Sequence, residues 1–255
     1  MGNGEPVIRL AVSRGFNISY EDVGSGLAVV LVPGAFGCAA DWRESGYVDR
    51  LAESRRVLSV DPLGHGKSDK PYDAGAYTAP GVGADIVAAM DAAGVERAAV
   101  WGYSRGAWLA SLAAIEFPER VSALVVGGQG LTVQRDPNPP WLEPLALGDW
   151  EAFWPLFMDL SEEQRRPFQE RNDPRAMAAV FKGPRQQPAE FDLARVRVPA
   201  LVYCGGDDDP ESVRPTARAL GAQLTLIDSC DHMEAFDAVE LVLPIALGHL
   251  DSFGA

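Results

Sequence analysis

The sequence predicts an α/β protein with a mostly parallel, eight-stranded sheet, helices on both faces and a small helical insertion after the sixth strand. Apolar runs of strand length alternate with longer helical patterns over most of the 255 residues, which is typical of a parallel sheet covered on both sides. The run 28–32 is apolar throughout, as expected of a strand that is buried on both faces. The length fits one large domain with an inserted segment.

The elements follow in a regular order along the chain. Strands are expected at residues 8–12, 17–21, 28–32, 57–60, 98–101, 121–126, 200–203 and 223–227. Helices are expected at residues 48–53, 83–93, 107–116, 213–220 and 235–250. The first two strands form an opening pair, and the glycine-containing stretch 22–26 is the turn that leaves it.

The alternation stops between residues 126 and 200. The stretch 136–141 contains three prolines, which lack amide donors and cannot continue a helix or a central strand. Short helices are expected after it, at residues 149–160, 161–170 and 173–181. Trp150, Phe153, Trp154 and Phe157 lie at helical spacing in the first of them. This stripe packs on the body of the protein, lines a pocket, or does both.

Composition excludes several classes of partner. A net charge of -14 leaves no plausible basic face for nucleic acid or an anionic membrane. No apolar run approaches the roughly 20 residues of a membrane span. Residues 1–6 show no signal-peptide pattern, so a cytoplasmic location is expected.

The three cysteines give no metal-ligand spacing. Cys38, Cys204 and Cys230 are odd in number, and buried thiols are the expected state, with a bridge between Cys204 and Cys230 as the alternative. We therefore expect neither a metal site nor another cofactor.

Residues 102–106, Gly-Tyr-Ser-Arg-Gly, carry the strongest chemical signal. They place the pattern G-x-S-x-G between the apolar run 98–101 and a helical stretch. A serine on so tight a turn brings Gly102 and Gly106 against each other, and only glycine leaves room there. The turn would expose the Ser104 hydroxyl as a nucleophile beside the first amides of a helix. The alternative is a plain glycine-rich turn.

A serine hydroxyl needs a base to take its proton, and the chain contains three histidines. His65 precedes the serine, and His249 lies near the end of the last helix, where a satisfied or solvent-facing histidine is expected. His232 stands in the loop after the last strand, at a carboxyl end, and Ser104 also follows a strand. We therefore predict His232 as the base.

A carboxylate should orient the imidazole of the base. Asp207, Asp208 and Asp209 follow the strand 200–203, again at a carboxyl end. Any of them could instead be a turn or helix-capping residue. One of the three is expected to orient His232, and the others to cap the next helix.

Two backbone amides should bind the oxyanion. One is the amide of Arg105, which follows the nucleophile, and the other comes from the loop 33–37 after the third strand. Ala35 is the expected second donor.

With these segments in place, the chain resembles the α/β-hydrolase fold superfamily from about residue 7 to its end. The resemblance rests on segments 29–37, 61–69, 102–106, 205–209 and 231–232, in the family's order of nucleophile, acid and base. It implies that Ser104 and His232 are the catalytic serine and histidine. The family's G-x-x-D pattern gives Asp208 when counted from Gly205 and Asp209 when counted from Gly206, and we predict Asp208.

The same resemblance implies a domain organisation. Residues 1–130 and 196–255 form the core domain, and 131–195 form the family's helical cap. His65 becomes a structural residue of a loop that borders the site. We expect the loops and the cap to supply substrate contacts through Phe36, Tyr103, Trp154 and Met233.

One position departs from the family. The family usually has His-Gly after the third strand, whereas this chain has Pro33-Gly34. Because that histidine normally ties down the oxyanion loop without reacting, the hydrogen bonding of the loop must differ here. The run 34–37 also lacks the three-glycine motif of some lipases and esterases.

The predicted function is hydrolysis of a small carboxylic ester, lactone or thioester through an acyl-enzyme on Ser104. Cleavage of carbon–carbon bonds, amide hydrolysis, acyl transfer and cofactor-free perhydrolysis use the same triad and remain alternatives. Serine at 104 argues against dehalogenases and epoxide hydrolases, which need a carboxylate nucleophile. A non-catalytic binder on the same fold is the alternative of another class. The sequence does not indicate the oligomeric state.

Overall fold

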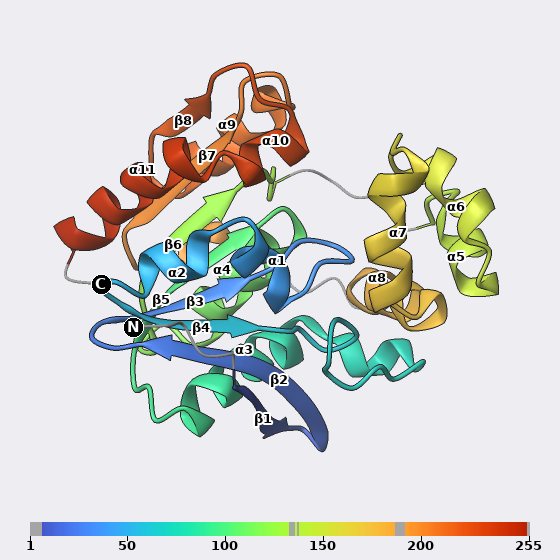
Figure 1. The fold of residues 1–255 in the computed structure, drawn as a ribbon, viewed down its shortest axis with the longest axis horizontal. Helices are drawn as coiled ribbons and strands as arrows, with labels where there is room; N and C mark the ends of the chain where they lie inside the picture. The colour runs from blue at the N-terminus through green and yellow to red at the C-terminus, as the bar shows by residue number, and fades with distance from the viewer. Residues whose placement is uncertain (1–6, 133–135, 137, 187–191, 254–255) are drawn as a thin grey trace.

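The computed structural model describes residues 7–132, 136, 138–186 and 192–253. Its centre is an eight-stranded sheet in the order β1-β2-β4-β3-β5-β6-β7-β8 (Figure 1). β2 pairs antiparallel with β1 and β4, and all other neighbours are parallel, so the predicted fold class is confirmed. The strands are β1 (Ile8–Ser13), β2 (Phe16–Gly24), β3 (Ala28–Val32), β4 (Arg56–Val60), β5 (Ala98–Tyr103), β6 (Val121–Gly127), β7 (Ala200–Gly205) and β8 (Leu224–Ile227).

Helices cover both faces of the sheet. The side chains of β3 alternate between two apolar clusters: Val30 and Val32 pack with α3, α4 and α9, whereas Val29 and Leu31 pack with α1, α2, α10 and α11. This alternation explains why the run 28–32 carries no polar residue. The helices are α1 (Ala39–Glu44), α2 (Tyr47–Leu51), α3 (Ala79–Ala92), α4 (Arg105–Glu116), α9 (Pro210–Ala219), α10 (His232–Asp237) and α11 (Val239–Ser252), with two short 3-10 helices, η1 (Ala74–Tyr77) and η2 (Leu193–Arg195).

Four helices inserted between β6 and β7 form a separate group beside the carboxyl ends of the parallel strands (Figure 1). They are α5 (Leu142–Leu147), α6 (Trp150–Phe157), α7 (Glu162–Arg171) and α8 (Pro174–Gln186), and we call them the cap. The limits of the cap, 131 and 195, stay predictions, because residues 133–135, 137 and 187–191 beside them lie outside the described residues. The same holds for the ends of the predicted core, residues 1–6 and 254–255.

The helix predicted at 235–250 is wrong as a single element. α10 begins at His232, where Asp231 caps it by accepting hydrogen bonds from the amides of Met233 and Glu234. The chain then leaves helical geometry at Ala238 (φ -74°, ψ 49°) before α11 begins. The hydroxyl of Tyr47 donates to the carbonyl of Phe236 at 2.9 Å, and this tertiary bond satisfies a carbonyl at the end of α10.

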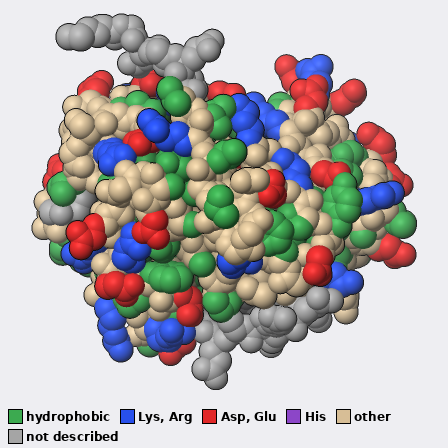
Figure 2. Space-filling model, turned by 90° about the horizontal axis from the view of Figure 1, so that it is seen from below, with side chains coloured by type: hydrophobic (Ala, Val, Ile, Leu, Met, Phe, Trp, Pro, Cys, Tyr) green, Lys and Arg blue, Asp and Glu red, His purple; other side chains and the backbone are tan. Residues whose placement is uncertain are grey.

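The surface mixes both signs of charge. Figure 2 shows acidic and basic side chains interspersed over the face that it draws, with apolar side chains scattered among them. Within the part of the chain that the structure describes, no helix combines the length and apolar character that crossing a membrane requires.

Candidate active site

Ser104 stands at the turn between β5 and α4 in a backbone conformation that few residues adopt. Its φ is 52° and its ψ is -124°. A Cβ atom on Gly102 would lie 2.0 Å from the carbonyl oxygen of Gly106, and one on Gly106 would lie 2.1 Å from that of Val32. The steric cause that the pattern G-x-S-x-G indicates is therefore present: a side chain at either position would collide with backbone.

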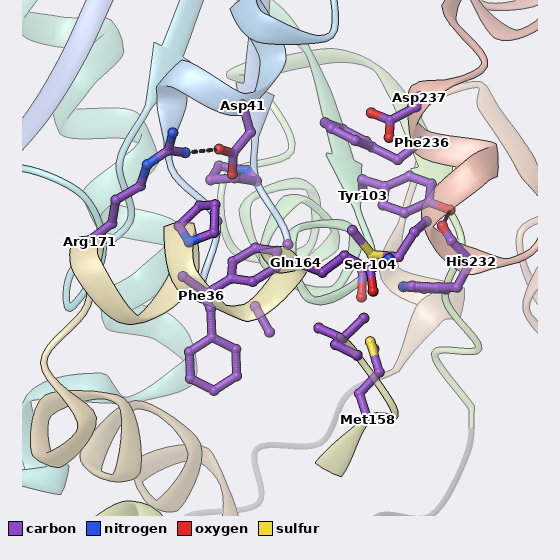
Figure 3. A pocket seen from close by; sticks show the side chains of 18 of the residues that line it. Phe36, Asp41, Tyr103, Ser104, Met158, Gln164, Arg171, His232, Phe236 and Asp237 are labelled. Carbon is purple, nitrogen blue, oxygen red and sulfur yellow. Dashed lines mark hydrogen bonds and ion pairs between the residues drawn. The ribbon is translucent and has the colours of Figure 1, made fainter. Parts of the chain in front are cut away.

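His232 and Asp208 meet above the carboxyl ends of β7 and β8. The Nδ1 atom of His232 lies 2.7 Å from Oδ2 of Asp208. Because a carboxylate only accepts hydrogen bonds, Nδ1 carries the proton and Nε2 is left with a lone pair. Figure 3 shows the free edge of the imidazole pointing toward Ser104. The carboxylate of Asp208 therefore holds the imidazole, and the imidazole is directed toward the serine.

Asp207 and Asp209, in the same loop, make different contacts from those of Asp208. The side chain of Asp209 accepts from the amide of Ser212 at 3.2 Å and caps α9. The amide of Asp207 donates to the carbonyl of Cys230 at 3.0 Å, which ties the loop after β7 to the loop that carries His232. Geometry thus assigns the three adjacent aspartates to three separate tasks, and the one against His232 is Asp208.

Tyr103 lies directly beneath the histidine. Its hydroxyl donates to the carbonyl of His232 at 2.6 Å, and the centres of the two rings are 5.3 Å apart. Burial raises the pKa of the Tyr103 hydroxyl, so it stays protonated as a donor. Tyr103 also borders the cavity, and its hydrogen bond holds the backbone of His232.

The loop after β3 lies against the elbow. A Cβ atom on Gly34 would lie 3.4 Å from Cβ of Ser104, so the loop backbone approaches the serine closely. The amide of Gly37 donates to the carbonyl of Gly34 at 3.2 Å, and inside this turn Phe36 has a φ of 62°. Such a conformation costs a bulky residue about 1–3 kcal/mol and persists only where the surroundings enforce it.

A cavity of about 550 Å³ joins these groups, and its walls come from the core and from the cap. Ser104, His232 and Ala35 border it, together with all four predicted substrate contacts, Phe36, Tyr103, Trp154 and Met233. The aromatic stripe of α6 packs into the protein and also lines the cavity. Phe153 and Trp154 are buried, and Trp154 and Phe157 border the cavity.

The comparisons with known proteins agree with this architecture. The family described as alpha/beta hydrolase fold matches residues 28–173. The chain belongs to the α/β-hydrolase fold family. It is 30% identical over 252 residues to the 2-hydroxymuconate semialdehyde hydrolase of Pseudomonas sp. (strain CF600), covering 90% of this chain and 89% of that protein.

Other similar proteins carry several different names. This α/β-hydrolase is 28% identical to a putative 2-succinyl-6-hydroxy-2,4-cyclohexadiene-1-carboxylate synthase of Bacillus subtilis (strain 168), over 79% of this chain and 82% of that one. The enol-lactonase of Burkholderia xenovorans LB400 superimposes with a TM-score of 0.81 at 20% identity, over 95% of this chain and 100% of that one. Epoxide hydrolase VrEH1 of Vigna radiata superimposes with a TM-score of 0.77 at 16% identity, over 98% and 99% of the two chains. At these identities the structures show a shared fold.

The other two histidines of the hydrolase do not border the cavity. His65 is 1% exposed, its Nδ1 atom lies 3.2 Å from the carbonyl oxygen of Leu63, and burial lowers its pKa to about 3. It is therefore a neutral residue of the interior. His249 lies on α11, where partial burial lowers its pKa as well.

The cysteines of the hydrolase are all free: Cys38 and Cys204 are buried, and Cys230 is half-buried. Burial raises the pKa of the Cys38 and Cys204 thiols to about 11, so both are protonated and unreactive at neutral pH. Within the described residues, no three His, Cys, Asp or Glu side chains are grouped to hold a metal ion.

Several cavity residues carried no signal in the sequence. Met158, Leu160 and Phe168 come from the cap and extend its apolar wall. A polar wall lies at the other side, where Arg171 of α7 forms ion pairs with Asp41 and Glu44 of α1. These residues belong to no motif, because their place in the cavity depends on how the cap sits on the core.

Proposed function

We propose that this hydrolase cleaves small, uncharged carboxylic esters, including lactones and thioesters, through an acyl-enzyme on Ser104. One observation carries the proposal: the hydrogen bond between His232 and Asp208 prepares a base whose free nitrogen faces the serine of the elbow. Family membership and the hydrolase relatives support hydrolytic chemistry on this fold and disfavour a non-catalytic binder.

The reaction follows from the positions of these groups. Nε2 of His232 takes the Ser104 proton as Oγ bonds to the substrate carbonyl, and the oxyanion that forms accepts hydrogen bonds from the amides of Ala35 and Arg105. The imidazolium, stabilised by Asp208, then protonates the leaving alcohol or thiol as the carbon–oxygen or carbon–sulfur bond breaks. Water, activated by the same imidazole, attacks the acyl-enzyme and releases the acid and free Ser104.

The cavity walls favour a neutral substrate. The cap side offers aromatic and aliphatic carbon, which suits an acyl or alcohol group of modest size. Among the described residues that line the cavity, Arg171 is the one lysine or arginine, and Asp41 and Glu44 already neutralise it. A carboxylate on the substrate would therefore lack a cationic partner while facing acidic side chains.

Hydrolysis of a carbon–carbon bond is the second candidate. The overall similarity to 2-hydroxymuconate semialdehyde hydrolase, over 90% of the chain, favours it. The serine, histidine and acid would act in the same order. The ester candidate ranks first because the described residues of the cavity offer no unpaired cation to a substrate that carries a carboxylate.

A labelling experiment tests the nucleophile. A fluorophosphonate probe should modify the wild type at Ser104 and leave Ser104→Ala unlabelled, because the reagent needs a serine activated by a base. Ser45→Ala is the matched control, since Ser45 also lines the cavity but comes from the end of α1 and not from the elbow. In parallel, aryl esters of increasing acyl length should be turned over by the wild type and by Ser45→Ala only. A wild type that resists labelling, or a Ser104→Ala variant that is labelled equally, would overturn the proposal.

A further inference from the structure

The oxyanion loop of this chain lacks the anchor that the family usually places directly after the third strand. Pro33 has no amide proton, so the position where the family carries a histidine supplies neither a side-chain nor a backbone donor. The loop nevertheless holds Phe36 at a φ of 62°, which would relax if nothing enforced it. The Gly37–Gly34 hydrogen bond closes the turn on itself, so contacts from outside residues 33–37 decide how the turn sits on the core.

Asn172, directly after α7 in the cap, reaches that loop. Its Nδ2 atom donates to the carbonyl of Phe36 at 2.6 Å and to the carbonyl of Phe168 at 2.9 Å. Both hydrogens of the amide group therefore point at carbonyl oxygens, which fixes which side of the amide faces the loop. Asn172 is 7% exposed, so little water competes for either bond.

The ring of Phe36 is held by the cap as well. It contacts five aromatic rings, with centres between 5.3 and 5.8 Å away. Four of these rings belong to α6 and one to α8: Trp150, Phe153, Trp154, Phe157 and Phe181. The cap thus contacts both the side chain and the carbonyl of Phe36. Phe36 is the residue after Ala35, the proposed oxyanion donor.

We infer that Asn172 is a positioning residue that holds the oxyanion loop against Ser104 from the cap. It does not touch the substrate. Its hydrogen bond fixes the peptide after Phe36, and the ring contacts fix the side chain, so the loop that carries the amide of Ala35 keeps its place at the cavity. The inference rests on the proposed function, because it concerns the donor that stabilises the acyl-transfer transition state.

Small movements of this loop matter, because the space between it and the elbow is narrow: a Cβ atom added to Gly34 would lie 3.4 Å from Cβ of Ser104. A misplacement of about 1 Å in a catalytic group costs on the order of 100-fold in rate. Loss of the Asn172 bond should therefore lower the rate of the chemical step far more than it weakens binding of the neutral substrate.

The test replaces the donor and keeps its volume. Asn172→Leu is close in shape to asparagine but donates no hydrogen bond, and Asn172→Ala is the second variant. Arg165→Ala is the matched control, because Arg165 lies on α7 and bonds to the carbonyl of Leu160 within the cap. All three are first checked by thermal unfolding, and the loop measurement below uses the variants that fold.

For turnover of a neutral aryl ester, we expect kcat of the Asn172 variants to fall by about 10- to 100-fold, with KM changed by less than about threefold. Affinity for an aryl trifluoromethyl ketone, which forms an oxyanion adduct on the serine, should fall by a similar factor. Arg165→Ala should match the wild type in both. A purely structural role would not move the ketone affinity and kcat together, so unchanged ketone affinity in a folded variant would overturn the inference.

Hydrogen exchange of the peptide spanning residues 33–38 gives a readout without catalysis. We expect faster exchange in the Asn172 variants than in the wild type and in Arg165→Ala. Equal exchange in all of them would overturn the inference. A wild type that hydrolyses no ester would instead overturn the proposed function, while the exchange result still decides whether Asn172 holds the loop.

Discussion

The rim of the core and the cap meet at one cavity but build it in different ways. The core holds Ser104, His232 and Asp208 through short backbone constraints: a glycine elbow, a capped helix start and a loop tied to its neighbour. The cap contributes mostly side-chain packing, with aromatic rings in contact with one another and with Phe36. The core therefore carries the groups proposed for the chemistry, and the cap carries most of the apolar wall that a substrate would meet. Asn172, which holds the oxyanion loop, is the cap residue that we infer to act on the chemistry.

This difference predicts two kinds of variant. A change in the core rim should lower turnover of every substrate by a similar factor. A change in the cap wall should alter the ranking of substrates and leave the best turnover close to that of the wild type. The variants below test that division, beginning with the largest expected effect.

Asp208→Asn should produce the largest loss. An amide in place of the carboxylate can hold the wrong tautomer of His232 and cannot stabilise the imidazolium, which costs about 10⁴-fold in kcat in a comparable triad. Steady-state turnover of an aryl ester measures it.

Asp209→Asn is the matched control, because the side chain of Asp209 caps α9 and asparagine also caps a helix. It should retain turnover within about twofold. Equal losses in the two variants would mean that the loop acts as a unit and that the 2.7 Å contact of Asp208 has no special role.

The sequence predicts the residues that the core contributes to this site better than those that the cap contributes. The sequence predicts the elbow, a candidate order of serine, acid and base, and the loop after β3, because each depends on a few residues close together in the chain. Met158, Arg171 and Asn172 were missed, because their roles depend on how α6 and α7 sit over the core. The break at Ala238 was missed for a similar reason, since the hydroxyl of Tyr47 that bonds to Phe236 lies far away in sequence.

The second prediction concerns the stability of the core under the cap. His65 is buried and its pKa is lowered to about 3, whereas an unfolded histidine titrates near pH 6.5. Below pH 6.5, His65 binds a proton in the unfolded chain but stays neutral in the folded chain. Protonation therefore favours the unfolded chain, and the free energy of unfolding falls as the pH falls toward 3. The loss is about 1.4 kcal/mol per pH unit, or about 2 kcal/mol at pH 5.

Urea unfolding of the wild type and of His65→Gln at pH 7.5 and pH 5 measures the contribution of His65 to the free energy of unfolding. Carboxylates titrate in both proteins, so the comparison isolates the histidine. The wild type should lose about 2 kcal/mol more than His65→Gln between the two pH values. Equal losses would show that His65 is protonated in the folded protein.

Met158 tests the cap as a specificity wall. It borders the cavity at the end of α6 and is half-buried. Met158→Ala opens space and should shift the ratio of kcat/KM for a longer over a shorter acyl chain by about tenfold, since a few methylene groups in an apolar pocket contribute that much. Met158→Phe should shift the ratio the other way. If both variants lower turnover of all chain lengths equally, the apolar wall of the cap acts on the chemistry, and its proposed role in selecting the acyl chain fails.

The smallest effect is expected from the acidic rim of the cavity. Asp237, on α10, borders the cavity and is exposed, with its carboxylate held by the Ser45 hydroxyl at 2.8 Å. Asp237→Asn should raise kcat/KM for an aryl ester with a carboxylate on its acyl chain by about two- to threefold relative to the neutral ester, because it removes one repulsive charge in a wet environment. Glu119→Gln changes the net charge equally but lies just before β6, at the amino ends of the parallel strands and so away from the cavity, and should have no effect. Raising the salt concentration should abolish the difference between the two esters, since mobile ions screen exposed charges.

A preference for the neutral ester that survives high salt would place the selection against carboxylates deeper in the cavity, on Asp41 and its ion pair with Arg171 of the cap.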